Sequence, residues 1–106
     1  MKLAILRPQA LRDRQMEVRY YRKEAGTKVA VQWVKVTHAA LDQIELGPGL
    51  PVLGKTLGIP GLRTWWVSRF PFLWFYFERD DHLDVVRILG ERQDVAAILG
   101  TEFDGG

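Results

Sequence analysis

The sequence of 106 residues contains no cysteine. This absence excludes a disulfide framework, a thiolate zinc site and a cysteine nucleophile. A chain without cysteine also suits a reducing compartment, so we expect it in the cytoplasm. Histidine is almost as scarce, because His38 and His82 are the only two, and two are too few for a histidine-rich metal site. The composition therefore predicts a protein with neither a metal ion nor a cofactor.

Long hydrophobic runs are absent as well. The apolar start over residues 3–6 is followed at once by Arg7 and Pro8, which is too short for a secretory signal. The aromatic run over residues 70–77 is flanked by Arg69 and Glu78. Both runs fall far short of the roughly 20 apolar residues that a spanning helix needs. The sequence therefore predicts no membrane anchor.

What is present is a balanced globular composition, 47% hydrophobic and 26% charged. This predicts one domain over residues 1–99, followed by a flexible tail over 100–106. The formal net charge is only +2, but the first quarter of the chain is crowded with cations. A solvated helix face explains this cluster best, and an anionic partner remains the alternative. Its members are Arg7, Arg12, Arg14, Arg19, Arg22 and Lys23.

Two hydrophobic periods follow each other along the chain. After a short strand over residues 2–6, the apolar residues repeat with a helical period over 9–25 and again over 28–46. Gly26 and Thr27 are suited to cap the two helices where they meet. A Gly- and Pro-rich loop over 47–61 precedes three segments of period two, 62–68, 72–78 and 83–89. The fold class predicted is α+β: an N-terminal strand, a two-helix hairpin and a three-stranded antiparallel meander.

The middle strand has two apolar faces, because residues 72–77 read Phe-Leu-Trp-Phe-Tyr-Phe. Such a strand is expected at the centre of a sheet, covered on both sides. Two helices cover one face, so we expect the other to meet a dimer mate, a partner chain or a ligand. The free chain should then be less soluble than its complex. In the last strand, strict alternation places Leu83, Val85, Arg87 and Leu89 on one face and Asp84, Val86 and Ile88 on the other. A helical turn over 94–99 is expected to fold back onto the domain.

Four motifs in order carry a family resemblance. They are YYRKEAG at 20–26, ELGPGLP at 45–51, GLRTWWVSRFPFLWFYF at 61–77 and LDVVRILGERQD at 83–94. Over residues 3–99 the chain resembles the ParE/RelE superfamily of toxins from type II toxin–antitoxin systems, and its ParE-like branch in particular. The resemblance implies the fold predicted above, with the first strand at the edge of the sheet.

The resemblance also implies partners. A cognate antitoxin is expected to form a hetero-oligomer with the chain and to contact its apolar residues, for which Val67, Phe72, Trp74 and Phe75 are the candidates. ParE-like toxins poison DNA gyrase, whereas RelE-like toxins cut mRNA on the ribosome. Neither activity implies sequence-specific DNA binding by the toxin chain itself.

One position departs from the family pattern. Gly90 stands where members often carry a histidine near the end of the last strand, and glycine has no side chain to transfer a proton. His82 is predicted at the opposite end of that strand. Tyr76 and Glu91 are the remaining candidates for an acid or base. The sequence therefore favours a toxin that binds a protein target, with a ribosome-dependent mRNA endonuclease and a non-toxic toxin-fold protein as alternatives.

Four arginines on or beside the strands are the candidate functional residues: Arg63, Arg69, Arg87 and Arg92. Family members usually carry arginine at the positions of Arg63 and Arg87. A planar guanidinium can bind phosphate or an acidic protein surface through paired hydrogen bonds. The structural alternative is internal, with Arg87 paired to a carboxylate such as Asp94. Nearby aromatic residues are expected in the core rather than in a base-stacking platform.

Overall fold

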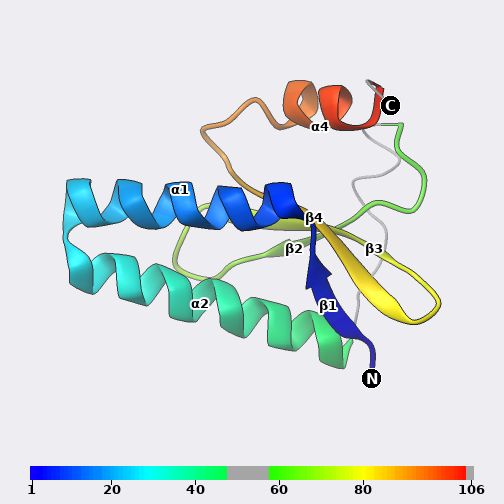
Figure 1. The fold of residues 1–106 in the computed structure, drawn as a ribbon, viewed down its shortest axis with the longest axis horizontal. Helices are drawn as coiled ribbons and strands as arrows, with labels where there is room; N and C mark the ends of the chain where they lie inside the picture. Colours follow the sequence, from blue (N-terminus) through cyan, green and yellow to red (C-terminus); the bar gives the residue numbers. More distant parts are fainter. Residues whose placement is uncertain (48–57, 105–106) are drawn as a thin grey trace.

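The computed structural model describes residues 1–47 and 58–104. Its elements follow the predicted α+β order, and the helical turn expected over 94–99 is the start of the last helix (Figure 1). Residues 48–57, which include most of the predicted Gly- and Pro-rich loop, lie outside the described residues. The elements are β1 (Leu3–Leu6), α1 (Pro8–Ala25), α2 (Thr27–Leu46), β2 (Arg63–Trp66), β3 (Phe72–Glu78), β4 (His82–Gly90) and α4 (Val95–Asp104).

The helical hairpin begins and turns where the sequence indicates. Pro8 opens α1, where its missing N–H group costs no hydrogen bond. Gly26 ends α1 with φ 95°, and its N–H group donates to the carbonyl oxygen of Arg22. Gly26 is also the residue before α2, so Thr27 is the first residue of that helix and not its cap. One glycine thus provides the whole turn between two long helices.

The sheet has four strands in the order β1-β4-β3-β2. β1 pairs parallel to β4 at one edge, whereas β3 pairs antiparallel to both β4 and β2. The aromatic strand β3 is therefore central, as predicted, and the aliphatic strand β4 is central beside it. None of the helices in the described part of the chain has the length and apolar character needed to cross a membrane.

A β-bulge interrupts the alternation of β4. Phe75 pairs with Arg87 and Tyr76 with Val85, which leaves Val86 as the extra residue. Strict alternation is consequently wrong beyond this point: Ile88 joins Val85 in the core beneath the helical hairpin, and Leu89 joins Val86 on the other face. A bulge depends on strand pairing, so the sequence of one strand does not reveal it.

The two faces of the sheet carry two separate cores. Phe72, Trp74 and Tyr76 pack with Trp33 and other residues of the helical hairpin. On the opposite face, Phe75 and Phe77 pack with Leu62, Val86, Leu89 and Leu99. In Figure 1, α4 lies at the top of the view and α2 at the bottom, with the strands between them.

The expectation of an uncovered second face is therefore wrong. The C-terminal helix of the same chain covers its centre, with Leu99 fully buried and Val95, Ile98 and Phe103 packed around it. Helix α4 also continues to Asp104, so residues 100–104 are helical where a flexible tail is expected. Apolar burial of Leu99 and Phe103 gives this segment the stabilisation that a free tail lacks.

Candidate functional site

The four candidate arginines are not brought together by the fold. Arg63 begins β2 and lies near the end of the sheet where Glu78 and His82 are found. Arg69 is in the β2–β3 turn and Arg92 follows β4, both at the opposite end. Arg87 lies between these two ends. A single cluster of four guanidinium groups around one ligand is thus not formed.

Arg63 takes part in a chain of charges on the surface. Its Nη1 donates to Glu78 Oε1 at 2.7 Å, and Lys2 Nζ donates to the other carboxylate oxygen at 3.0 Å. The hydrogen bonds from Lys2 and Arg63 hold the pKa of Glu78 below its ordinary value. Two cations share one carboxylate, so these three side chains together keep one positive charge at this end of the sheet.

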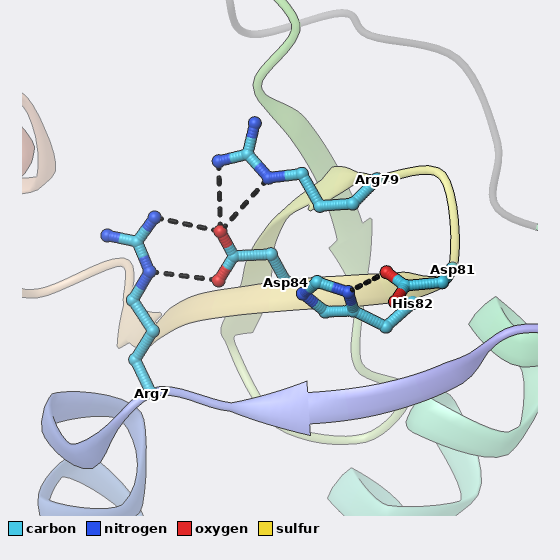
Figure 2. A network of polar contacts seen from close by, with 5 residues as sticks. All are labelled: Arg7, Arg79, Asp81, His82 and Asp84. Carbon is cyan, nitrogen blue, oxygen red and sulfur yellow. Dashed lines mark hydrogen bonds and ion pairs between the residues drawn. The ribbon is translucent and has the colours of Figure 1, made fainter.

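The carboxylate of Asp84 is held by two arginines (Figure 2). Arg7, just after β1, donates to both oxygens at 2.9 and 2.8 Å, and Arg79 donates to Oδ2 at 3.2 and 2.9 Å. These bonds, that of Arg7 first, lower the pKa of Asp84. In the adjacent turn, Asp81 lies 2.6 Å from His82 Nδ1. The network ties the end of β1 to the β3–β4 hairpin.

Arg87 makes the most buried ion pair in this region. Its Nε and Nη2 donate to the two carboxylate oxygens of Asp13 on α1 at 2.7 and 2.8 Å. The backbone N–H of Ile88 donates to the same carboxylate at 3.1 Å. Because β1 reaches only Val85, Asp13 satisfies an N–H group that has no strand partner on that side. The internal pairing considered from the sequence is therefore present, but with Asp13 and not Asp94.

Arg92 and Arg69 differ in their surroundings. Arg92 donates to the hydroxyl oxygen of Tyr20 at 2.9 Å, and its guanidinium carbon lies 4.8 Å from the centre of that ring. Arg69 is exposed and makes no side-chain hydrogen bond or ion pair with the described residues. Its φ of 72° places it in the left-handed region, which costs a non-glycine residue roughly 1–2 kcal/mol. Arg69 is therefore the candidate arginine left open for a partner.

The candidate acids and bases are dispersed or enclosed. Tyr76 is fully buried, and burial raises its pKa to about 12. His82 and Gly90 are the first and last residues of β4, so about 26 Å of strand separates them. Glu91 is exposed beyond the end of the strand. Among the residues of the described ranges, no three His, Cys, Asp or Glu side chains gather into a metal site.

The space beside Gly90 is tight. A Cβ atom built there would lie 3.1 and 3.2 Å from two ring carbons of Phe72, which pairs with Gly90 across the strands. Phe72 is itself almost fully buried. Any side chain at this position would require the Phe72 ring to give by a few tenths of an ångström, so the glycine is part of the packing.

Sequence reasoning missed two carboxylates on α1. Asp13 and Glu17 are four residues apart, so they share a helix face. Burial raises the pKa of Glu17, and its Oε2 is buried without a hydrogen-bond partner among the residues that the structure describes. The signal available in the sequence was this acidic pair within a strongly basic helix.

The four proposed antitoxin contacts lie in the interior. Val67, Phe72 and Trp74 belong to the core beneath the helical hairpin, and Phe75 to the core beneath α4. Their exposed fractions are at most 3%. Helix α4 therefore covers Phe75, and the helical hairpin covers the other three. Of the aromatic residues on the strands, Trp66 is largely exposed, at 60%.

The relationship to known proteins agrees with this arrangement. A family model described as the ParE toxin of the type II toxin–antitoxin system, parDE, matches residues 4–95. The chain belongs to this family. The ParE-family fold is also seen in a solved structure titled "Chromosomal ParDE TA system from P. aeruginosa".

That structure matches with a TM-score of 0.73 and 18% sequence identity, over 85% of this chain and 96% of the other. At this identity the likeness is one of fold. No curated protein sequence matches the chain.

Proposed function

We propose that this ParE-family chain is a growth-inhibiting toxin of the cytoplasm that acts by binding a protein target, DNA gyrase, and is neutralised by a cognate antitoxin. The observation that carries the proposal is the packing at position 90. Two ring carbons of Phe72 lie 3.1 and 3.2 Å from the point where a side chain of residue 90 would begin, which is closer than ordinary van der Waals contact. The end of β4 is therefore closely packed and offers no side chain at residue 90 for proton transfer.

The alternative activity, RNA cleavage, needs a base, an acid and cations around one phosphate. Tyr76 holds its proton too tightly and is enclosed in the core. His82 is at the far end of β4 from Arg92. Arg87 is committed to Asp13 by two charge-assisted hydrogen bonds. These placements favour recognition of a protein surface over proton transfer.

Two assays on the purified chain separate the targets. We expect inhibition of DNA supercoiling by gyrase in a dose-dependent manner and no new cuts in mRNA on translating ribosomes. If the chain cuts mRNA on ribosomes and leaves gyrase active, the proposal is wrong and the endonuclease alternative holds. Normal growth after induced expression of the folded chain, without its antitoxin, would leave the non-toxic toxin-fold alternative.

Arg69 is the residue whose replacement tests target binding most directly, because its guanidinium has no partner in the described structure. Arg69→Ala should weaken gyrase inhibition without unfolding the chain. Lys23→Ala is a matched control, because Lys23 is an exposed cation at the end of α1. Equal inhibition by both variants would remove Arg69 from the proposed contact.

A further inference from the structure

A small hollow, here called the turn hollow, lies between helix α2 and the turn that joins β2 to β3. Its volume is about 240 Å³, which is below the roughly 300–1,000 Å³ of pockets that enclose a drug-sized ligand. The turn hollow can therefore take one chemical group of a ligand, but not a whole cofactor. Its lining residues are Lys35, Val36, Ala39, Ala40, Gln43, Ser68 and Arg69.

Two elements that are far apart in the sequence bring polar side chains to the turn hollow. Lys35, Ala39 and Gln43 follow one another at intervals of four residues, so they share one face of α2. The short side chain of Ala39 leaves room between the two longer ones. Ser68 and Arg69 line the same hollow from the turn. The result is a small apolar floor with four polar side chains around it.

These four side chains have no partner within the chain. Lys35, Gln43, Ser68 and Arg69 are exposed, and their side chains form no hydrogen bond or ion pair with any residue that the structure describes. The lining holds two positive charges and no acidic residue. The polar groups of the turn hollow are thus available to a ligand.

The turn also offers backbone donors. The N–H groups of Ser68, Arg69 and Phe70 donate to no acceptor in the described part of the chain. Arg69 has a φ of 72°, in the left-handed region. Successive free N–H groups in a turn of this kind form a concave surface that binds anions. Strained backbone is also found most often at binding and catalytic sites.

We propose that the turn hollow binds a phosphate monoester group. Such a group carries a charge of about −1.5 to −2 at pH 7 and three strong acceptor oxygens, which matches the two cations of the lining. The planar guanidinium of Arg69 pairs with two of these oxygens, and Lys35 supplies a second positive charge. The Ser68 hydroxyl and the Gln43 amide are further donors at the same hollow.

Other anions match these groups less well. A carboxylate has one charge and two oxygens, so it would leave one cation and several donors without a partner. The phosphodiester of a nucleic acid also carries a single charge. The described lining contains no aromatic ring on which a base could stack.

This inference does not depend on gyrase as the target, because it concerns a small ligand. Arg69 takes part in both proposals, so phosphate binding is measured on the isolated chain without gyrase. An inactive chain in the gyrase assay that still binds phosphate would contradict the proposed target and leave the phosphate site standing.

The test is a titration of the full chain with inorganic phosphate at neutral pH, followed through the backbone amide resonances in nuclear magnetic resonance spectra. Sodium chloride is adjusted to keep the ionic strength constant, so that screening does not change. We expect saturable shifts of the amide resonances of Ser68, Arg69 and Phe70. Shifts that do not saturate, or that acetate reproduces at the same concentrations, would overturn the proposal.

Further probes identify the molecule that carries the phosphate. Phosphoserine represents a modified protein, and adenosine monophosphate represents a nucleotide. Tighter binding of either one than of inorganic phosphate supports the proposal and names the source, whereas equal binding of all three assigns recognition to the phosphate group alone. A single-stranded oligonucleotide without a terminal phosphate that binds more tightly than these probes would overturn the proposal, in favour of a nucleic-acid surface.

Charge variants then locate the site. Lys35→Ala/Arg69→Ala removes both cations of the lining and should weaken phosphate binding by about tenfold or more, because charge-assisted hydrogen bonds are lost. Lys23→Ala/Lys28→Ala is the matched control, since it removes the same charge from exposed positions outside the lining. Circular dichroism checks that both variants fold. Equal losses would overturn the proposal, because they indicate attraction to net charge alone.

Ala39→Asp tests the turn hollow without removing a cation. It places a carboxylate between Lys35 and Gln43, which should abolish phosphate binding by repulsion and by pairing with Lys35. Ala39→Asn is of nearly equal size without the charge and should keep most of the binding. Ala39 is exposed, so both variants should fold. Equal phosphate binding by the two variants would overturn the proposal.

Discussion

The guanidinium of Arg87 on β4 and the carboxylate of Asp13 on α1 face each other through two hydrogen bonds, of 2.7 and 2.8 Å. The two side chains are only 12% and 7% exposed. Asp13 also accepts the N–H of Ile88, so one carboxylate fixes the helical hairpin to a central strand. A residue that the family pattern marks as functional is therefore first a structural link in this chain.

Replacing Arg87 by Ala should lower the free energy of unfolding by about 3 kcal/mol, because it leaves a buried carboxylate without its partner. Chemical denaturation of the purified variant measures this loss. The double variant Arg87→Ala/Asp13→Ala should lose less than the sum of the single variants, since neither charge is then stranded. An Arg87→Ala protein of unchanged stability that no longer inhibits growth would instead assign Arg87 to target binding.

Glu17→Gln should stabilise the chain at neutral pH. Burial raises the pKa of Glu17, so the folded chain holds this proton more tightly than the unfolded chain, whose glutamate titrates near an ordinary pKa of about 4.3. The stabilising contribution is fully present below that value and is lost as pH rises through the folded pKa. The advantage of the variant should grow over the same pH range in denaturation experiments.

The control for this titration is Glu24→Gln, which changes an exposed glutamate of the same helix. Because this side chain is not buried, the variant should bring no comparable stabilisation at neutral pH. A Glu17→Gln advantage that is the same at pH 4 and at neutral pH would contradict the assignment.

Gly90→Ala should destabilise the fold by about 1–3 kcal/mol, because the added methyl group presses on the ring of Phe72. Gly47→Ala is a matched control, since a Cβ there has no atom of the described residues within 4 Å. Thermal unfolding distinguishes the two variants. If Gly90→Ala is as stable as the control, the ring moves aside freely and the packing argument for position 90 is wrong.

Arg69→Gly should not destabilise the chain and should stabilise it by up to about 1 kcal/mol. Glycine adopts the φ of 72° without steric cost, although its greater freedom in the unfolded state offsets part of the gain. Arg69→Ala keeps the strain and should show no gain. If denaturant titrations show a larger loss of unfolding free energy for Arg69→Gly than for Arg69→Ala, the backbone of Arg69 is not strained.

Leu99→Asp should open the core beneath α4. The substitution places a carboxylate among Phe75, Val86 and Leu89. Because a buried Leu is lost and a charge is buried in its place, the free energy of unfolding should fall by more than about 3 kcal/mol. We expect binding of a hydrophobic dye and aggregation. Ala97→Asp changes an exposed position of the same helix and should do neither. A Leu99→Asp protein that stays soluble and does not bind the dye would show that α4 contributes little to covering the sheet.

The sequence by itself determined the order of the elements from β1 to β4. The helical period, the turn at Gly26 and the alternation over 72–77 are local signals, because each records which face of one element is buried. The same signals place Tyr76 and Phe72 in the interior and put His82 and Gly90 at opposite ends of one strand.

Only the tertiary structure decided what those faces contact. Arg87 pairs with Asp13, 74 residues away in the chain, and no spacing rule links the two. Val86 is bulged because β3 and β4 pair with a shift. The sequence predicts a helical turn over 94–99 that folds back, but only the fold shows that its Leu99 covers the second face of the sheet. Periodicity indicates that a side chain is buried, but its neighbours depend on how distant segments approach each other. That approach set both the second core and the pairing of Arg87 with Asp13.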